Sequence, residues 1–160
     1  KPLSEIYWLN VADEGFPFGG VIEHTNFIDK ENYQGKNVAY LSRYFAHSEP
    51  IAKMSDDEIK EVMLAPLAKI YPDFKMEDVI KVHVFKTMTA ATVCDLNFST
   101  KVPNSKTSIE GMHIASMPHI YPDERSVNNS IRVAAEVTKQ MGFDSGFVPK
   151  GQSMVGMLGF

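Results

Sequence analysis

Histidines and one cysteine are the residues with which this chain could carry acid–base, metal or thiol chemistry. His24 stands in an alternating run, and histidine is the side chain that titrates near neutral pH without help from its surroundings. A histidine inside a strand more often serves as a hydrogen-bonded structural residue, so catalysis by His24 is the minor alternative. His113 and His119 are separated across Pro118 by a spacing that matches no standard zinc pattern. The sequence therefore predicts no metal site, and it identifies no catalytic residue.

Cys94 is the single cysteine, which excludes an intramolecular disulfide and favours a reducing, cytoplasmic location. It stands beside Asp95 without the positive charges that activate a thiol, and we interpret it as a small buried apolar residue. His83 and Lys86 fall on opposite faces of one expected strand and cannot act together. No G-x-S-x-G elbow of the serine hydrolases occurs in the sequence.

Three alternating runs near the start of the chain predict strands joined by short connections. They cover residues 6–11, 21–28 and 37–45, with a polar hairpin connection at 29–36. Strands that follow one another this closely are most simply paired as an antiparallel meander. A sheet face that no helix covers can form the wall of a ligand cavity. We expect the substrate-binding residues to come from these strands, namely His24, Tyr40, Arg43 and Tyr44.

A helix follows the three strands. Ser55 and Glu58 have the spacing of a capping box, and apolar residues then recur at helical intervals up to Ile70. Pro66 removes a backbone donor, so we expect it to kink or divide this helix before Tyr71 ends it. Alternation returns at residues 79–87 and 90–96, which predicts two further strands.

The last part of the chain reads as a linker, a short strand and a second helix. The expected ranges are 101–108, 112–116 and 128–141, with Gly142 as a left-handed helix end. The helix is expected to bury a stripe of small and apolar residues: Ile131, Ala134, Ala135, Thr138 and Met141. The predicted fold class is α+β, with an antiparallel or mixed sheet of about five to six strands flanked by helices.

Composition is that of an ordinary globular domain with one sizeable core in 160 residues. The net charge is −4 and the sequence has no block of Lys or Arg, which argues against nucleic acid and anionic membranes as partners. No apolar run approaches the roughly 18–20 residues that cross a bilayer. We therefore expect a small-molecule substrate, no nucleic acid and no membrane span. A strand expected almost at Lys1 also favours a piece of a larger protein.

Several segments carry a family resemblance through their order and spacing. They are residues 17–27 (PFGGVIEHTNF), 38–44 (VAYLSRY), 72–74 (PDF), 111–116 (GMHIAS), 121–125 (YPDER) and 128–131 (NNSI). The first three are similar to the substrate-domain half of FAD-dependent amine-oxidase-like flavoproteins. That group includes protoporphyrinogen-oxidase-like, phytoene-desaturase-like and UDP-galactopyranose-mutase-like proteins. The last three are similar to the C-terminal FAD-contacting stretch of the same group, and the match covers about residues 4–142.

The resemblance implies a domain organisation and a cofactor. Residues 1–108 would be a substrate-domain-like sheet and helix, residues 109–142 the closing strand and helix of a FAD-binding domain, and residues 143–160 a tail. The implied function is FAD-dependent oxidoreduction, in which this chain forms the substrate-side wall and the last flavin contacts. The implied cofactor-binding residues are Ser116, Arg125, Ser126, Asn128 and Asn129.

Two departures from that family limit what this chain does alone. No G-x-G-x-x-G turn is present to seat a pyrophosphate, because Gly19 and Gly20 lead into a strand-like run. Ser126 also stands where relatives commonly place a glycine close to the flavin. We therefore expect FAD in the parent protein, while the isolated chain is expected to be inactive.

Two alternatives stay open. A flavin-dependent nucleotide-sugar mutase would need arginines that converge on a diphosphate, and the chain has only Arg43, Arg125 and Arg132. A cofactor-free ligand-binding or protein-interaction domain would instead use Trp8 and exposed strand edges as contact surface. A homodimer through the C-terminal helix is a further expectation, because that helix would lose its usual cover in a fragment.

Overall fold

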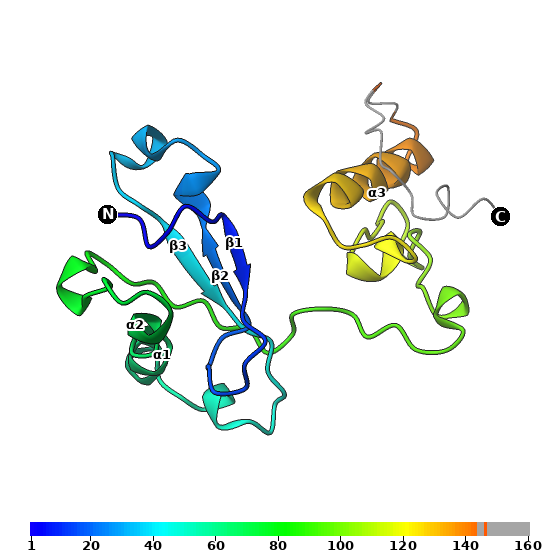
Figure 1. The fold of residues 1–160 in the computed structure, drawn as a ribbon. Coiled ribbons are helices and arrows are strands. Elements are labelled where there is room, and N and C mark those ends of the chain that lie inside the picture. Colours follow the sequence, from blue (N-terminus) through cyan, green and yellow to red (C-terminus); the bar gives the residue numbers. More distant parts are fainter. Residues whose placement is uncertain (144–145, 147–160) are drawn as a thin grey trace, which may run out of the picture. The chain divides into compact units, whose positions relative to one another are not determined.

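The structure is a computed structural model that describes residues 1–143 and Gly146 (Figure 1). It divides into two compact units, Lys1–Met88 and Thr89–Phe160, called here the N-terminal and C-terminal units and described separately. The expected linker at 101–108 falls inside the C-terminal unit. Apart from Phe143 and Gly146, the expected tail at 143–160 lies outside the described residues. Within the described part of the chain, no helix is both long and apolar enough to cross a membrane.

The N-terminal unit contains an antiparallel sheet of three strands in the order β1-β2-β3. The strands are β1 Trp8–Asn10, β2 Gly20–Glu23 and β3 Ala39–Ser42. Trp8 pairs with Ile22, and Ile22 pairs with Tyr40, so these three residues form one row across the sheet. The predicted meander is therefore confirmed, although each strand is shorter than its alternating run.

The two faces of this sheet have different surroundings. Val21 is almost completely buried and packs with Phe18, Leu67 and Tyr71, while Leu9 and Leu41 lie against the same cluster. Because side chains alternate along a strand, Trp8, Ile22 and Tyr40 project from the opposite face. Ile22 is buried there, whereas Trp8 and Tyr40 remain 55% and 49% exposed. One face therefore holds the core, and the other is open at its rims.

Two helices cover the core side, α1 Asp56–Leu64 and α2 Leu67–Ile70 (Figure 1). The predicted capping box is present, since Ser55 N–H donates to Glu58 Oε2 at 2.7 Å and Glu58 N–H donates to Ser55 Oγ at 3.4 Å. The hydrogen bonds that the Glu58 carboxylate accepts from the Ser55 N–H and the Ser55 hydroxyl hold the pKa of this carboxyl below its usual value. Pro66 separates the two helices, as predicted from its missing backbone donor.

Short 3-10 turns complete both units. In the N-terminal unit they are η1 His24–Asn26, η2 Lys30–Tyr33, η3 Pro50–Ala52 and η4 Met76–Asp78. In the C-terminal unit they are η5 Phe98–Thr100 and η6 Met117–Ile120. The last helix is α3 Val127–Gln140, and Gly142 follows it with φ of +90°, the left-handed conformation expected at a helix end.

The prediction of a five- or six-strand sheet is wrong, because the described chain has only three strands. Residues 79–87 and 90–96 form no ladder, and 112–116 contributes a single bridge from His113 to Lys106. Alternation alone makes an extended segment, whereas a strand also needs a neighbour for its backbone hydrogen bonds. Ile80 and Phe85 accordingly stay 77% and 92% exposed.

Two smaller expectations about burial are also wrong. The helix α3 buries Asn129, Val133 and Val137, not the stripe centred on Ile131, and Ile131 and Met141 are about two-fifths exposed. At 100° per residue the apolar arc of α3 spans about 200°, and the C-terminal unit covers only one side of it. Cys94 is exposed rather than buried, because the expected strand around it is absent.

Candidate functional site

His24, Tyr33 and Tyr40 form an aromatic cluster where β2 and β3 meet their connecting turns. His24 Nε2 lies 2.7 Å from the Tyr33 hydroxyl, and the two rings stand edge to face at 5.3 Å. The Tyr40 ring lies 5.7 Å from the His24 ring, again edge to face. The structure thus brings together two of the expected substrate-binding residues, His24 and Tyr40. Tyr33 was not expected there, because it lies in a polar stretch whose turn carries it back to the sheet.

A second aromatic cluster lies beside β1. The Tyr7 ring is 5.1 Å from Phe27 and 6.3 Å from Trp8. Trp8 Nε1 donates to Asn10 Oδ1 at 2.8 Å, so the polar edge of the indole is satisfied while its face stays exposed. Since Trp8 and Tyr40 flank Ile22 in one row, these two rings lie at opposite rims of the open sheet face.

Arg43 and Tyr44, the other two expected substrate residues, lie at the far end of β3. The Arg43 guanidinium pairs with the Glu49 carboxylate and donates to the Pro17 carbonyl at 3.3 Å. Arg43 and Tyr44 border an open depression of about 380 Å³, which is lined otherwise by residues of the 11–19 connection. Arg43 and Tyr44 follow Tyr40 by three and four residues, which corresponds to about 10–13 Å along an extended strand. The four expected residues therefore form two separate groups.

Glu23 is a buried carboxylate on β2 that the sequence did not single out. It accepts hydrogen bonds from the Leu3 amide at 2.7 Å and the Ser4 hydroxyl at 2.6 Å, which tie the first residues to the sheet. Burial raises the pKa of the neighbouring Tyr71 phenol, and the negative charge of Glu23 acts in the same direction. Glu23 has its partners inside the fold, so we assign it a structural role.

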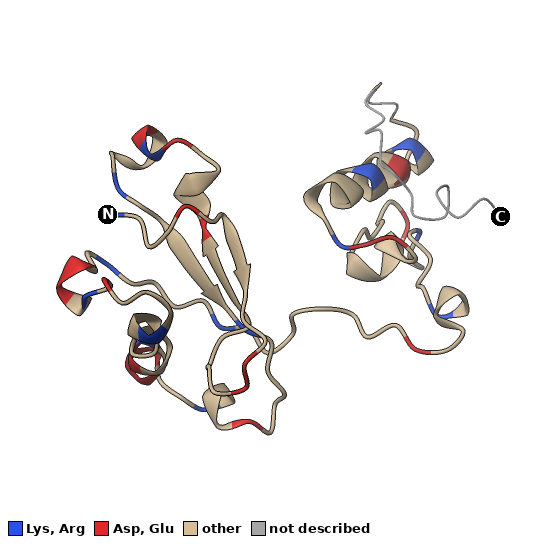
Figure 2. Ribbon diagram, viewed as in Figure 1, with Lys and Arg blue, Asp and Glu red and all other residues tan. Residues whose placement is uncertain are grey.

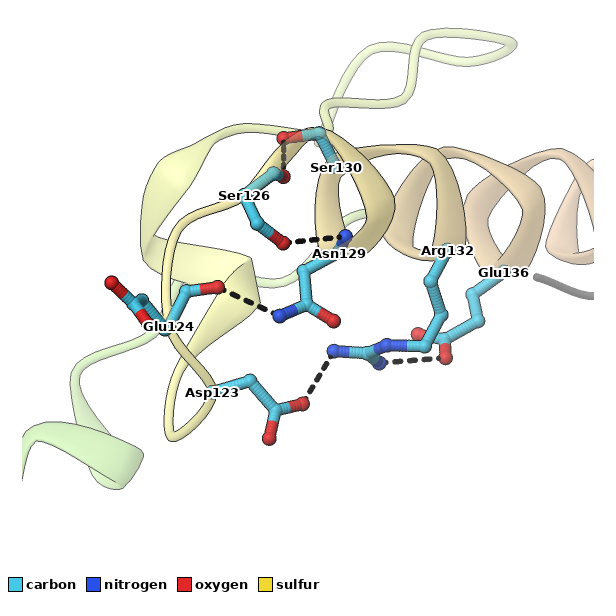
Figure 3. A network of polar contacts seen from close by, with 7 residues as sticks. All are labelled: Asp123, Glu124, Ser126, Asn129, Ser130, Arg132 and Glu136. Carbon is cyan, nitrogen blue, oxygen red and sulfur yellow. Dashed lines mark hydrogen bonds and ion pairs between the residues drawn. The ribbon is translucent and has the colours of Figure 1, made fainter. Parts of the chain in front are cut away.

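Two of the expected cofactor residues, Ser126 and Asn129, contact each other at the start of α3 (Figure 3). Ser126 caps the helix, since its Oγ accepts the Asn129 amide at 3.1 Å. The buried Asn129 side chain turns back and donates to the Glu124 carbonyl at 2.7 Å. Ser130 Oγ donates to the Ser126 carbonyl at 2.9 Å. These contacts fix the loop that leads into α3.

Arg132 holds the same loop from the next turn of α3. It pairs with Asp123 at 2.7 Å and with Glu136 at 2.9 Å, and the Asp123 side chain is only 6% exposed (Figure 3). Arg125 instead donates to the Ala90 carbonyl at 2.8 Å, which joins the loop to the start of this unit. Sequence reasoning did not identify the pairing of Arg132 with Asp123, because nine positions separate the two residues.

Ser116 lies before η6 and pairs with a histidine. Its backbone N–H donates to His119 Nδ1 at 3.2 Å, and its hydroxyl oxygen lies 3.1 Å from the same nitrogen. His119 Nε2 is buried and has no hydrogen-bond partner among the described residues, and the same holds for His113 Nδ1. Unpaired buried polar atoms are uncommon, so this stretch carries hydrogen-bonding capacity that the described chain does not use.

The start of α3 has the features of an anion-binding site. Asn128 is exposed, the first turn contains no acidic residue, and the helix dipole favours negative charge at this end. Of the expected cofactor residues, Ser126 and Asn128 lie at this helix start, whereas Asn129 and Arg125 act on the loop through the Glu124 and Ala90 carbonyls. No group of three metal-ligating side chains occurs in the described residues.

Charges of both signs are dispersed over each unit (Figure 2). A comparison with protein-family models, curated proteins and solved structures finds no match to this chain.

Proposed function

We propose that this chain is part of an FAD-dependent oxidoreductase of the amine-oxidase-like kind. The N-terminal unit forms the wall on the substrate side, and the loop before α3 supplies the last cofactor contacts. The single observation that carries the proposal is the sheet face with exposed rims on which His24 and Tyr40 meet, because a substrate wall requires accessible apolar surface with a few polar groups.

The cofactor part of the proposal is supported by the fixed loop at α3. The Asp123–Arg132 pair and the Asn129–Glu124 bond hold the helix start in one geometry. A preformed helix start binds an anion without first ordering the chain. When bound, FAD supplies hydride or electron transfer, and the chain's own residues position the flavin and enclose it.

A mutase-like activity is less well supported by the arginines. Arg43 is paired with Glu49, and Arg132 with Asp123 and Glu136. A diphosphate site would have to draw these guanidinium groups away from carboxylates. The cofactor-free ligand-binding alternative is favoured by the same open sheet face, and the presence of flavin separates it from the oxidoreductase.

The test uses the protein expressed from its complete reading frame. A strand, a glycine-rich turn and a helix encoded upstream of Lys1, together with flavin absorbance in the purified protein, are the expected results. Asn128→Asp places a carboxylate at the helix start and is expected to weaken FAD binding about tenfold, while Asn128→Ser is the uncharged control. A complete protein that carries no flavin, or equal affinity of both variants, would overturn the proposal.

A further inference from the structure

The rings at the rims of the open sheet face are called here the aromatic face. It consists of Trp8, Ile22 and Tyr40 in one row, with His24 and Tyr33 beside Tyr40. Adjacent strands lie about 4.8 Å apart, so the row from β1 to β3 spans about 10 Å, the width of a multi-ring molecule. Half-exposed aromatic rings at both rims offer stacking surfaces at that separation.

The strand positions that share this face carry no charge. They are Trp8, Asn10, Gly20, Ile22, Tyr40 and Ser42. Glu23 is the one charged residue within β1–β3, and it accepts hydrogen bonds from Leu3 and Ser4. A charged ligand placed here would lose hydration without gaining an opposite charge, whereas a neutral ligand would not.

Gly20 keeps the second row of the aromatic face low. It pairs with Asn10 and Ser42, and an added Cβ would lie 3.2 Å from Ser42 Oγ. Its φ lies outside the left-handed region, so the backbone conformation does not require glycine here. The missing side chain therefore affects the shape of the face rather than the path of the chain, since Ser42 Oγ and Ile22 Cδ1 lie close to this position and Gly20 is buried.

From these observations we infer that the aromatic face binds a planar, uncharged, multi-ring or similarly flat apolar molecule. As a statement about the substrate of the oxidoreductase, this inference rests on the proposed function. As a statement about the ligand, it rests on Trp8, Tyr40 and the absence of charge between them, and it holds without flavin. The Arg43 depression at the other end of β3 lies outside this face.

The single tryptophan makes the inference directly measurable, since Trp8 is the only indole in the chain and lies on the face itself. The 160-residue chain is titrated with 1-pyrenemethanol while Trp8 fluorescence is followed. Saturable quenching is expected, with affinity at least about tenfold greater than for 1-pyrenesulfonate or 1-pyrenemethylamine. Tyr40→Ala is expected to lower the affinity for 1-pyrenemethanol about two- to tenfold. Tyr40→Phe retains the ring and is expected to bind as the unmodified chain does.

Phe85→Ala is the matched control, because Phe85 is an exposed ring of the same unit outside the aromatic face. Absent or non-saturable quenching, equal affinity for the charged probes, or a Tyr40→Ala variant indistinguishable from Phe85→Ala would overturn the inference. Selective binding of 1-pyrenemethanol, combined with a complete protein that carries no flavin, would retain the ligand class and reject the oxidoreductase. The two failures are therefore distinguishable.

Discussion

Arg132 and Asp123 form an ion pair of 2.7 Å that fixes the loop before α3 to the second turn of that helix. The Asp123 carboxylate is nearly inaccessible, whereas the Arg132 side chain is about one-quarter exposed. A buried carboxylate that loses its cation is costly, because it has already given up its hydration. The pair therefore contributes to the order of the loop on which the proposed cofactor contacts depend.

Arg132→Met is expected to lower the free energy of unfolding of the C-terminal unit by about 2 kcal/mol, less than for a fully buried pair because Arg132 is partly exposed. Urea denaturation followed by circular dichroism measures the effect. Lys139→Met on the same helix is the control, and Asp123→Asn added to Arg132→Met is expected to restore part of the loss. An Arg132→Met midpoint equal to that of Lys139→Met would contradict this role.

Ser55→Ala removes the hydroxyl that accepts the Glu58 amide at the start of α1. The loss of a serine cap is expected to cost about 1 kcal/mol and to lower the urea midpoint without changing the slope. Ser48→Ala, at an exposed serine in a loop, is the control. If both variants unfold at the same concentration, the capping box does not stabilise α1.

Tyr71 makes the stability of the N-terminal unit sensitive to alkaline pH. Burial raises the pKa of its phenol in the folded chain, with a further contribution from Glu23. The folded chain then retains a proton that the unfolded chain loses near pH of about 10. This stabilisation is complete below that pH and is lost as the pH rises through the folded pKa.

Tyr71→Phe is therefore expected to show a smaller decline in the urea midpoint between about pH 9 and pH 11 than the unmodified chain. Tyr44→Phe, which changes an exposed tyrosine, is expected to retain the full decline. Parallel declines for all three proteins would show that Tyr71 does not couple ionisation to folding.

Features governed by neighbouring residues could be predicted from the sequence. The Ser55–Glu58 box, the break at Pro66 and the left-handed Gly142 each follow from chemistry within a few positions. Features that depend on distant partners could not. The Glu23 carboxylate accepts hydrogen bonds from Leu3 and Ser4, which lie about twenty positions away in the sequence. The 79–87 run pairs with no neighbouring strand. Alternation specifies an extended backbone, and pairing adds information that a single run does not contain.

The candidate site divides in the same way. The sequence identified His24 and Tyr40 as residues of adjacent strands, and the antiparallel register brings their rings together. The sequence also grouped Arg43 with them. However, Arg43 follows Tyr40 by three residues, which is enough to place it at the other end of β3. Trp8 reaches the aromatic face through the register of β1, which only the folded chain defines.

The uncovered side of α3 leads to the last prediction. Val127, Ile131, Ala134, Thr138 and Met141 follow one another at intervals of four and three, the spacing of a helix–helix seam. Val127, Ile131 and Met141 are exposed, whereas Val133 and Val137 are buried against Ile120. A solvent-exposed apolar stripe favours association, so we expect the isolated chain to self-associate through α3 as its concentration rises.

Ile131→Gln is expected to shift sedimentation velocity profiles toward the monomer, because it places an amide in the centre of the seam. Gln140→Ala, on the opposite side of the helix, is the control and is expected to leave association unchanged. Hydrogen exchange supplies an independent measure, since residues 128–141 should become more protected as the chain associates. A chain that stays monomeric at every concentration, with α3 as protected as β1–β3, would mean that α3 needs no further cover. The proposal that this unit comes from a larger flavoprotein would then lose its physical motive, because a helix that is stable alone has no face reserved for a missing sheet.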